Sequence, residues 1–265
     1  YTYFNANVLD LDRVKQRIRS DKGWIDYDVL VLAPGIEYDY TSMGIKDPDT
    51  MAVLKSSYPA GFISVKEQEV IVDSLKNFKK GVFILTVPPG IYRCAASPYE
   101  RACLVAAFFK RNSIKGKVVL IDGREKPAVN SMGFLAAFSE LYSGYIEYMN
   151  STVIRGVNPH DRVLKTDFDE IKFEGAAIYP RIRAARMIER FGIHNPNSVQ
   201  KDANIDPFKY HVIGDDKVYV TGDCRPMPFS KSASVAISEG RHIAKVITAR
   251  LQGKNVQWVT PESVC

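Results

Sequence analysis

The hydrophobic pattern is clearest around Gly81–Val87, an apolar and β-branched run with the sequence GVFILTV. A run of this length and type predicts a buried strand. Lys117–Asp122, KVVLID, predicts a second strand of the same kind. Apolar side chains recur between them at helical spacing, so we expect a strand–helix–strand unit with parallel strands. The inward residues of that helix are Ala102, Val105, Ala106 and Phe109.

The helix of this unit is expected to begin at the sequence Ser-Pro-Tyr-Glu, residues 97–100. Ser97 can cap the helix, and Pro98 fits its first position. Glu100 can reach back to Ser97 and close a capping box.

Cys94 lies in the loop between the first strand and this helix. Open α/β sheets bind ligands at the carboxyl ends of their parallel strands, which is where this loop is expected. The helix N-terminus and the neighbouring Arg93 and Arg101 favour a thiolate there. Cys94 is therefore a candidate redox or nucleophilic cysteine; the alternative is a buried structural thiol.

Two further predicted strands end in glycine-containing turns, where the backbone can come close to another group. Residues 28–32 run into Ala33–Gly35, and Val218–Thr221 runs into Gly222 and Asp223. Glycine has no side chain to obstruct such an approach. Asp223 is placed to accept hydrogen bonds from ligand hydroxyls; the alternative is an ordinary turn aspartate.

The rest of the pattern predicts helices, an antiparallel excursion and irregular segments. Helical periodicity is expected over residues 65–78, 134–148, 179–191 and 232–253, with Gly253 as the last helix's stop. A strand is expected within residues 1–12, and short antiparallel strands at 151–155, 163–166 and 170–173. Residues 41–66 are expected to be irregular because of their glycines and prolines. The last twelve residues are expected to form a tail.

Composition excludes several classes of protein. The 265 residues are 46% hydrophobic and 25% charged, as in an ordinary globular protein. The net charge of +6 is spread along the chain, so no nucleic-acid partner is expected. No apolar stretch reaches the length of a membrane span and there is no signal peptide, so membrane association is not expected. Because residue 1 is Tyr rather than Met, we expect a missing upstream segment.

Cysteine spacing and missing motifs narrow the chemistry. Four cysteines (Cys94, Cys103, Cys224 and Cys265) permit a disulfide but lack zinc-ligand spacing, and no metal site is predicted. No GxGxxG, Walker A or HExxH motif is present. The first strand is followed by PPGIYRCAASPYE instead of a glycine fingerprint, which disfavours NAD(P)H at that position.

Three segments resemble one flavoprotein family. Residues 26–35 (DYDVLVLAPG) and 218–223 (VYVTGD) resemble the internal FAD-binding motifs of glutathione-reductase-like flavoproteins. Tyr92–Cys103, YRCAASPYERAC, is similar to the redox-cysteine segment of the flavoprotein subunit of flavocytochrome c sulfide dehydrogenase, a relative of sulfide:quinone oxidoreductase. Pro226–Ser232 and the helix around Gly240 match the same subunit.

The resemblance implies an α/β, two-dinucleotide-binding-domain (glutathione-reductase-like) flavoprotein fold with its N-terminal part missing. Residues 1–72 would be the remainder of the FAD-binding domain, and residues 73–165 the second, NAD-domain-like domain that carries Cys94. Residues 166–252 would return to the FAD-binding domain and its covering helices, and residues 253–265 would form a C-terminal tail.

The resemblance also implies site residues and FAD as the cofactor. Cys94 matches the cysteine that faces the flavin and handles sulfur, and Glu100 matches a carboxylate proposed as acid/base beside it. For Glu100 the capping role stays as an alternative. Cys103 also matches a family position but reads as core. The cofactor-binding residues carried over are Ala33, Pro34 and Gly35 near the FAD, Gly222 with Asp223 at the ribityl chain, and Lys231 with Ser232 beside the isoalloxazine ring.

Two departures from the family pattern limit the carry-over. The family's N-terminal GxGxxG segment and the cysteine that carries its flavin covalently are absent from this sequence. The partner of the family's redox cysteine aligns with Ala203, so the family's redox disulfide cannot form. Cys224, beside the predicted flavin-binding aspartate, is an alternative partner.

The expected activity is FAD-dependent oxidation of sulfide or a related sulfur compound, with electrons passing to a c-type cytochrome subunit in the periplasm. One alternative is a sulfide:quinone reductase, although only twelve residues follow Gly253 where those relatives need amphipathic helices. Another alternative is a divergent, non-catalytic homologue that acts as a binding subunit.

Overall fold

The computed structural model describes residues 1–263, and Val264 and Cys265 lie outside the described residues. Two compact units divide the chain. One combines residues 1–37 with the described residues from 183 onward, and the other is residues 38–182. The predicted domain boundaries at 72/73 and 165/166 follow the family's domains and stay a prediction.

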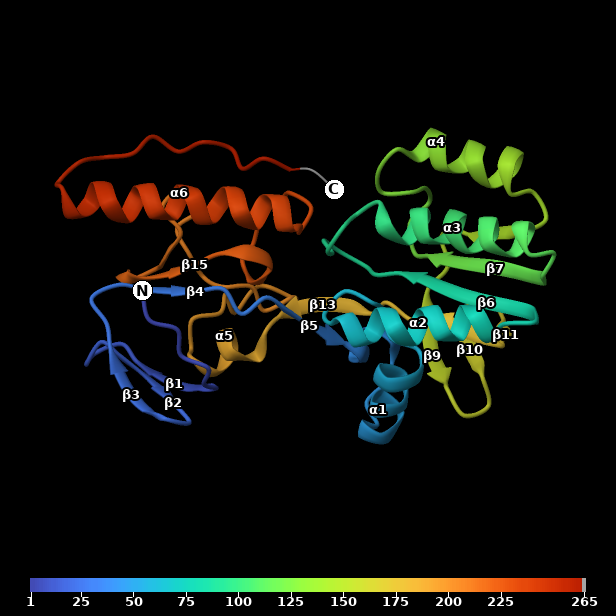
Figure 1. Ribbon diagram of the computed structural model, residues 1–265, viewed down its shortest axis with the longest axis horizontal. Helices are drawn as coiled ribbons and strands as arrows, with labels where there is room; N and C mark the ends of the chain where they lie inside the picture. Colours follow the sequence, from blue (N-terminus) through green and yellow to red (C-terminus); the bar gives the residue numbers. More distant parts are fainter. Residues whose placement is uncertain (264–265) are drawn as a thin grey trace. The chain divides into compact units, whose positions relative to one another are not determined.

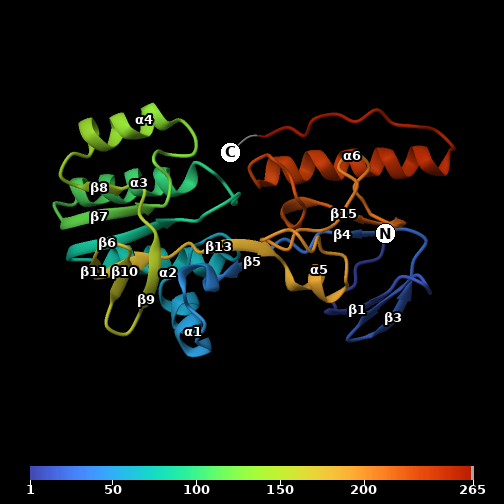
Figure 2. The same ribbon diagram turned by 180° about the vertical axis from the view of Figure 1, so that it is seen from behind.

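The unit of residues 38–182 is built on a four-stranded parallel sheet in the order β12-β6-β7-β8. α3 (Ser97–Arg111) connects β6 to β7 and packs on both, which confirms the predicted strand–helix–strand unit. In Figures 1 and 2, α3 and α2 lie on opposite faces of this sheet. Its strands are β6 (Lys80–Val87), β7 (Lys115–Asp122), β8 (Ile146–Met149) and β12 (Gly175–Ala177).

The core of this unit consists of apolar residues from both central strands and the inward stripe of α3. Phe83, Ile84, Val118 and Leu120 are completely buried, as is Phe109 of the helix. Both faces of a parallel sheet are covered in such a fold, which is why these strands are apolar throughout rather than alternating.

Shorter elements complete the unit of residues 38–182. A three-stranded antiparallel sheet in the order β11-β10-β9 confirms the predicted excursion. The elements are η1 (Tyr40–Met43), α1 (Pro48–Ser57), α2 (Val65–Asn77), α4 (Ser131–Ala136), η2 (Ala137–Leu141), β9 (Ile154–Asn158), β10 (Val163–Thr166) and β11 (Glu170–Lys172).

The other unit is organised around a small sheet in the order β14-β15-β4, covered by the long helix α6. β15 pairs in parallel with β4, with Val218 opposite Leu30 and Val220 opposite Leu32. Its elements are β1 (Val8–Asp12), β2 (Arg17–Ser20), β3 (Gly23–Asp26), β4 (Leu30–Leu32), α5 (Arg186–Arg190), β14 (His211–Val212), β15 (Asp215–Val220), η3 (Gly222–Cys224) and α6 (Ala233–Leu251). The chain crosses between the units within β5 (Ile36–Asp39) and β13 (Arg181–Ala184), which pair with each other.

Two predicted helices are wrong because strand pairing overrides their periodicity. Residues 134–148 end as a helix before Gly144, whose φ of +79° breaks it, and Ile146–Met149 joins the parallel sheet as β8. In the segment 179–191, Arg181–Ala184 is β13, and only Arg186–Arg190 is helical.

Two segments that lacked a clear period contain regular structure. Within the supposedly irregular residues 41–66, Asp47 accepts a hydrogen bond from the Thr50 amide and caps α1, with Pro48 in its first turn. The opening strand is limited to Val8–Asp12. The charged residues after it form the antiparallel strands β2 and β3, with Ser20 paired opposite Gly23 across their turn.

Candidate active site

The turns after β4 and β15 meet because their strands are parallel neighbours. The Thr221 amide donates to the Leu32 carbonyl at 3.0 Å, so Ala33–Gly35 and Gly222 begin at the same sheet edge. Gly35 and Gly222 both have φ of +73°, which a residue with a side chain rarely adopts. A Cβ on Gly35 would meet no atom within 4 Å, so the space beside this turn is open.

A buried ion pair fixes the turn after β15. Glu239 of α6 pairs with Arg225, and both side chains are 1% exposed. The Gly222 amide donates to Glu239 Oε2 at 3.1 Å, so the same carboxylate holds the turn backbone. Sequence reasoning missed Glu239. Its signal was available, because it lies four residues from both Val235 and Ile243 on the inward stripe of the helix.

Lys231 also ties down this turn. Its ammonium donates to Asp202 Oδ1 at 3.1 Å, to the Asp223 carbonyl at 2.7 Å and to the Arg225 carbonyl at 2.8 Å. These three acceptors match the three N–H groups of an ammonium. Lys231 therefore stabilises the position of Asp223 through the hydrogen bond to its backbone carbonyl. The sequence did not predict this role.

Ser232 begins the helix as predicted. It is the N-cap of α6, and its side chain accepts from the Val235 amide at 3.3 Å. Because α6 continues for nineteen residues, the cap is the N-terminus of a long helix that begins shortly after the Gly222 turn. Such a terminus favours negative charge on a bound group.

Cys224 does not serve as a disulfide partner. Its thiol is free, fully buried, and donates to the Thr221 carbonyl at 3.2 Å. Burial raises the pKa of this thiol to about 12. The suggested Cys94–Cys224 disulfide is therefore not formed. Ala203, at the family's cysteine position, is buried beside it, and its amide donates to the Cys224 carbonyl at 2.9 Å.

In the unit of residues 38–182, Cys94 lies where the sequence predicts it, in the loop between β6 and α3. Its side chain is half-buried, its sulfur is bonded in a disulfide, and its φ is +57°. The Cys94 carbonyl accepts from the Ser97 amide at 3.0 Å, so the loop closes directly onto the helix.

The predicted capping box at α3 is wrong. The N-cap is Ala96, no side chain caps the helix, and Ser97 is already helical. Glu100 is an exposed residue of the first turn, which leaves its predicted acid/base role as a prediction. Cys103 is half-buried rather than core, and burial together with the charge of Glu100 raises its pKa.

The end of β7 is closed by a buried carboxylate. Asp122 is fully buried, and its Oδ2 accepts from the hydroxyls of Tyr99 at 2.7 Å and Tyr148 at 3.0 Å. Its Oδ1 accepts from the Arg124 amide at 3.0 Å and guanidinium at 3.2 Å. Burial and the bond to Asp122 raise the pKa of Tyr99 well above its usual value, so its hydroxyl stays a donor.

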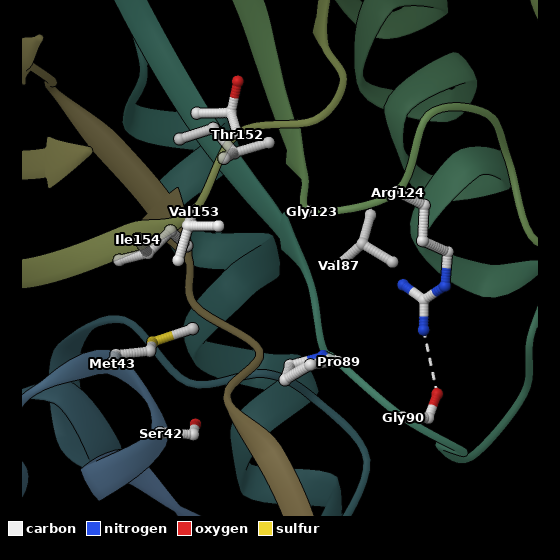
Figure 3. A pocket seen from close by; sticks show the side chains of 11 residues that line it. Ser42, Met43, Val87, Pro89, Gly90, Gly123, Arg124, Thr152, Val153 and Ile154 are labelled. Atoms are coloured by element: carbon white, nitrogen blue, oxygen red, sulfur yellow. Dashed lines mark hydrogen bonds between the residues drawn. The ribbon is translucent and has the colours of Figure 1, made fainter. Parts of the chain in front are cut away.

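A cavity of about 280 Å³ opens beside this cluster, at the carboxyl ends of β6 and β7 (Figure 3). Figure 3 shows Arg124 pointing toward Gly90, whose carbonyl accepts from the guanidinium at 2.8 Å. Because Asp122 neutralises Arg124, the cavity suits an uncharged group. Its apolar walls are Met43, Val87, Pro89, Ile121, Val153 and Ile154.

Solved structures share the fold of this chain. The sulfide:quinone oxidoreductase of Aquifex aeolicus superposes with a TM-score of 0.72 at 14% identity, covering 94% of this chain and 61% of that one. NDH2 of Plasmodium falciparum, solved with NADH, superposes with a TM-score of 0.61 at 13% identity, over 95% of this chain and 56% of that one. The predicted glutathione-reductase-like flavoprotein fold is confirmed.

Sequence comparison narrows the class. Residues 69–180 match the family model for the central part of the sulfide dehydrogenase [flavocytochrome c] flavoprotein chain. A type II NADH:quinone oxidoreductase of Staphylococcus haemolyticus is 25% identical over 99% of this chain and 69% of its own length. The mitochondrial sulfide:quinone oxidoreductase of Mus musculus is 30% identical over 45% of this chain and 26% of its own length. The resemblance to the flavocytochrome c sulfide dehydrogenase flavoprotein that the motifs predict is therefore confirmed over residues 69–180.

FAD is the cofactor that these relatives share, which confirms the cofactor prediction. The residues of this chain fit part of an FAD site. The open space beside Gly35 admits a ligand that a side chain would obstruct, and the half-buried Asp223 lies at the same sheet edge. The chain spans about six-tenths of the length of the solved sulfide:quinone oxidoreductase that it matches, at 61%.

Proposed function

We propose that this FAD-dependent oxidoreductase oxidises sulfide, or a related sulfur compound, at Cys94. The observation that carries the proposal is the conformation of Cys94, a non-glycine residue with φ of +57° at the carboxyl end of a parallel strand. Residues kept in such sparsely populated conformations concentrate at functional sites. The match of the segment 69–180 to the sulfide dehydrogenase flavoprotein supports the same assignment.

FAD would be held by the turns after β4 and β15. Gly35 and Gly222 leave the backbone open to the cofactor, and Asp223 would accept hydrogen bonds from its ribityl hydroxyls. Ser232 at the start of α6 would place the helix N-terminus near negative charge on the bound group. Bound FAD would supply a two-electron acceptor that can release electrons one at a time.

At Cys94 the reaction joins two sulfur atoms. H₂S would attack the Cys94 sulfur of the disulfide, which forms one S–S bond while the existing S–S bond breaks and its other sulfur leaves as a thiol. Re-forming the disulfide from the persulfide and this thiol releases one sulfur atom at the zero oxidation level, two protons and two electrons. The electrons go to FAD. Glu100 is exposed in the first turn of α3 and would accept one of the protons.

The electron donor distinguishes this proposal from the activity named for the type II NADH:quinone oxidoreductase relative. Nicotinamide dinucleotides bind where an acidic residue after the second strand of a βαβ unit reaches the ribose hydroxyls. Here Asp122 holds that place, but it is buried and accepts from Tyr99, Tyr148 and Arg124. A sulfur donor at Cys94 is therefore favoured over NADH.

The electron acceptor is proposed to be a c-type cytochrome subunit in the periplasm, by likeness to flavocytochrome c. The specific alternative is a quinone, because both curated relatives described above carry quinone in their names. No helix within residues 1–263 is long and apolar enough to cross a membrane.

Anaerobic titration of the flavin-loaded protein with sulfide tests the proposal. We expect the oxidised flavin absorption to bleach with sulfide and not with NADH, and Cys94→Ala to lose the sulfide response while keeping the flavin. Reoxidation by cytochrome c rather than by a soluble quinone analogue would support the cytochrome acceptor. A flavin that stays oxidised in excess sulfide would overturn the proposal and favour a non-catalytic binding subunit.

A further inference from the structure

The loop that carries Cys94 is held on both sides by tyrosine hydroxyls. The Tyr179 hydroxyl donates to the Arg93 carbonyl at 3.1 Å, and the Tyr92 hydroxyl donates to the Ala95 carbonyl at 3.0 Å. These are the carbonyls of the residues immediately before and after Cys94. Side chains therefore fix the peptide group that precedes Cys94 and the one that joins Ala95 to Ala96, while the carbonyl of Cys94 itself accepts from the Ser97 amide.

Both tyrosines are themselves immobilised. Tyr92 and Tyr179 are 3% and 2% exposed, and their rings pack edge to face with centroids 5.9 Å apart. Phe62 stacks on Tyr179 at 4.2 Å with an angle of 19° between the ring planes. Arg93 donates to the Phe62 carbonyl at 2.6 Å, so the residue before Cys94 is tied to the same aromatic cluster.

Both hydroxyls are committed to backbone carbonyls. Burial raises the pKa of Tyr92, which keeps its phenol protonated at neutral and mildly alkaline pH. Tyr179 is equally buried and its hydroxyl is committed to a backbone carbonyl. A neutral phenol that donates to a carbonyl is a positional constraint rather than a reactive group.

We propose that Tyr92 and Tyr179 are positioning residues that keep the Cys94 backbone in the left-handed region, so that its sulfur meets the sulfur substrate in one orientation. A residue with a side chain is disfavoured in this region and is retained there only when its surroundings over-determine it. Without the two hydroxyls, Cys94 relaxes toward negative φ and its Cα–Cβ bond turns away from the productive direction. The proposal rests on the reaction at Cys94 proposed above.

The test compares Tyr92→Phe, Tyr179→Phe and the double variant with the wild type, and uses Tyr148→Phe as the matched control. The control variant also removes a tyrosine hydroxyl from this unit. That hydroxyl donates to Asp122 and not to the loop that carries Cys94. In flavin-loaded protein we expect each single variant to lower the limiting rate of flavin reduction by sulfide about tenfold, and the double variant about a hundredfold. The sulfide concentration at half-maximal rate should stay within a factor of about two, because substrate binding as such is not removed.

A second readout does not depend on the proposed reaction. Trypsin cleaves after Arg93 and Arg101, so in fully reduced protein the peptide CAASPYER reports alkylation of Cys94 alone, and ACLVAAFFK reports Cys103. Freeing the loop should expose the half-buried Cys94 sulfur. We expect its alkylation by iodoacetamide to rise at least threefold in both tyrosine variants, with the Cys103 rate unchanged.

The outcomes separate the two proposals. A wild type that does not respond to sulfide defeats the reaction at Cys94, and the alkylation rates then decide whether the tyrosines hold the loop. The positioning role is overturned if sulfide reduces the flavin of the wild type and of both phenylalanine variants at the same rate. Equal losses in Tyr148→Phe would overturn it as well, because they would indicate a general loss of packing.

Discussion

The Gly222 turn in one unit and the Cys94 loop in the other both follow a parallel strand, yet they are built in opposite ways. Gly35 and Gly222 have φ of +73° and no side chain, and Gly35 has open space beside it. Cys94 has φ of +57° and keeps its side chain. Glycine adopts this conformation about as readily as any other, whereas for cysteine it is costly.

This difference indicates two purposes at equivalent places in the fold. Where the backbone must approach a large ligand, the turn has a glycine and no side chain. Hydrogen bonds of its backbone to Lys231 and Glu239 hold this turn in place. Where one side chain must be presented, the conformation is enforced by Tyr92 and Tyr179 through the neighbouring carbonyls.

The largest effect should come from removing the support beneath the Gly222 turn. Glu239→Ala leaves Arg225 charged and buried without its partner, and removes the acceptor of the Gly222 amide. We expect the free energy of unfolding to fall by about 3–5 kcal/mol. Urea denaturation of the flavin-free protein measures the loss, and FAD affinity should fall with it.

The matched control is an exposed ion pair. Lys165 and Glu170 pair at 2.7 Å, but their side chains are 57% and 60% exposed. Glu170→Ala should cost less than about 1 kcal/mol. Equal losses in Glu170→Ala and Glu239→Ala would show that burial does not distinguish the two pairs.

Much of the unit that carries Cys94 could be predicted from its sequence, because the information is local. Gly81–Val87 and Lys117–Asp122 are uniformly apolar, and that pattern identifies buried parallel strands whatever the rest of the chain does. The helix predicted over Arg181–Ala184 is wrong because the period of these residues resembles that of a helix. Their pairing with β5 depends on residues far away in the sequence.

The position of the candidate site could be predicted from the sequence, but the side chains that hydrogen-bond to it could not. Strand ends and glycines located the Gly222 turn and the Cys94 loop. The groups that stabilise these two segments come from distant parts of the sequence. Tyr179 donates to the carbonyl of Arg93, next to Cys94, and Lys231 donates to Asp202. No spacing rule connects such residues, so only the folded chain brings them together. Glu239 is the exception, since its place on the apolar stripe of α6 was visible.

A smaller effect should appear in the pH dependence of the free energy of unfolding, because the thiol of Cys224 beside the Gly222 turn is buried. Burial raises the pKa of Cys224 to about 12 from the ordinary thiol value of 9.0. The folded state therefore keeps the thiol protonated at pH values where the unfolded state loses the proton. Stability from this group is complete below about pH 9 and is lost as the pH rises from 9 to 12.

Cys224→Ala removes this dependence. Between pH 8 and pH 10 the wild type should lose about 1 kcal/mol of unfolding free energy more than the variant does. Denaturant titrations of both proteins at the two pH values measure the difference. Parallel pH dependence in wild type and variant would mean that Cys224 ionises in the folded protein as it does in water.

The smallest effect tests the comparison itself, by exchanging the residue types at the two turns. Gly35→Ala places a side chain at φ of +73° and should lower the free energy of unfolding by about 1 kcal/mol, although its Cβ meets no neighbour. Cys94→Gly should be more stable than Cys94→Ala by up to about 1 kcal/mol, because glycine tolerates φ of +57° and both variants lose the same sulfur. Denaturant unfolding measures all three variants. If Cys94→Ala proved the more stable of the two, the cost of the left-handed backbone would be smaller than the entropy that glycine adds to the unfolded chain. The claim that Tyr92 and Tyr179 hold a strained residue would then lose its physical basis.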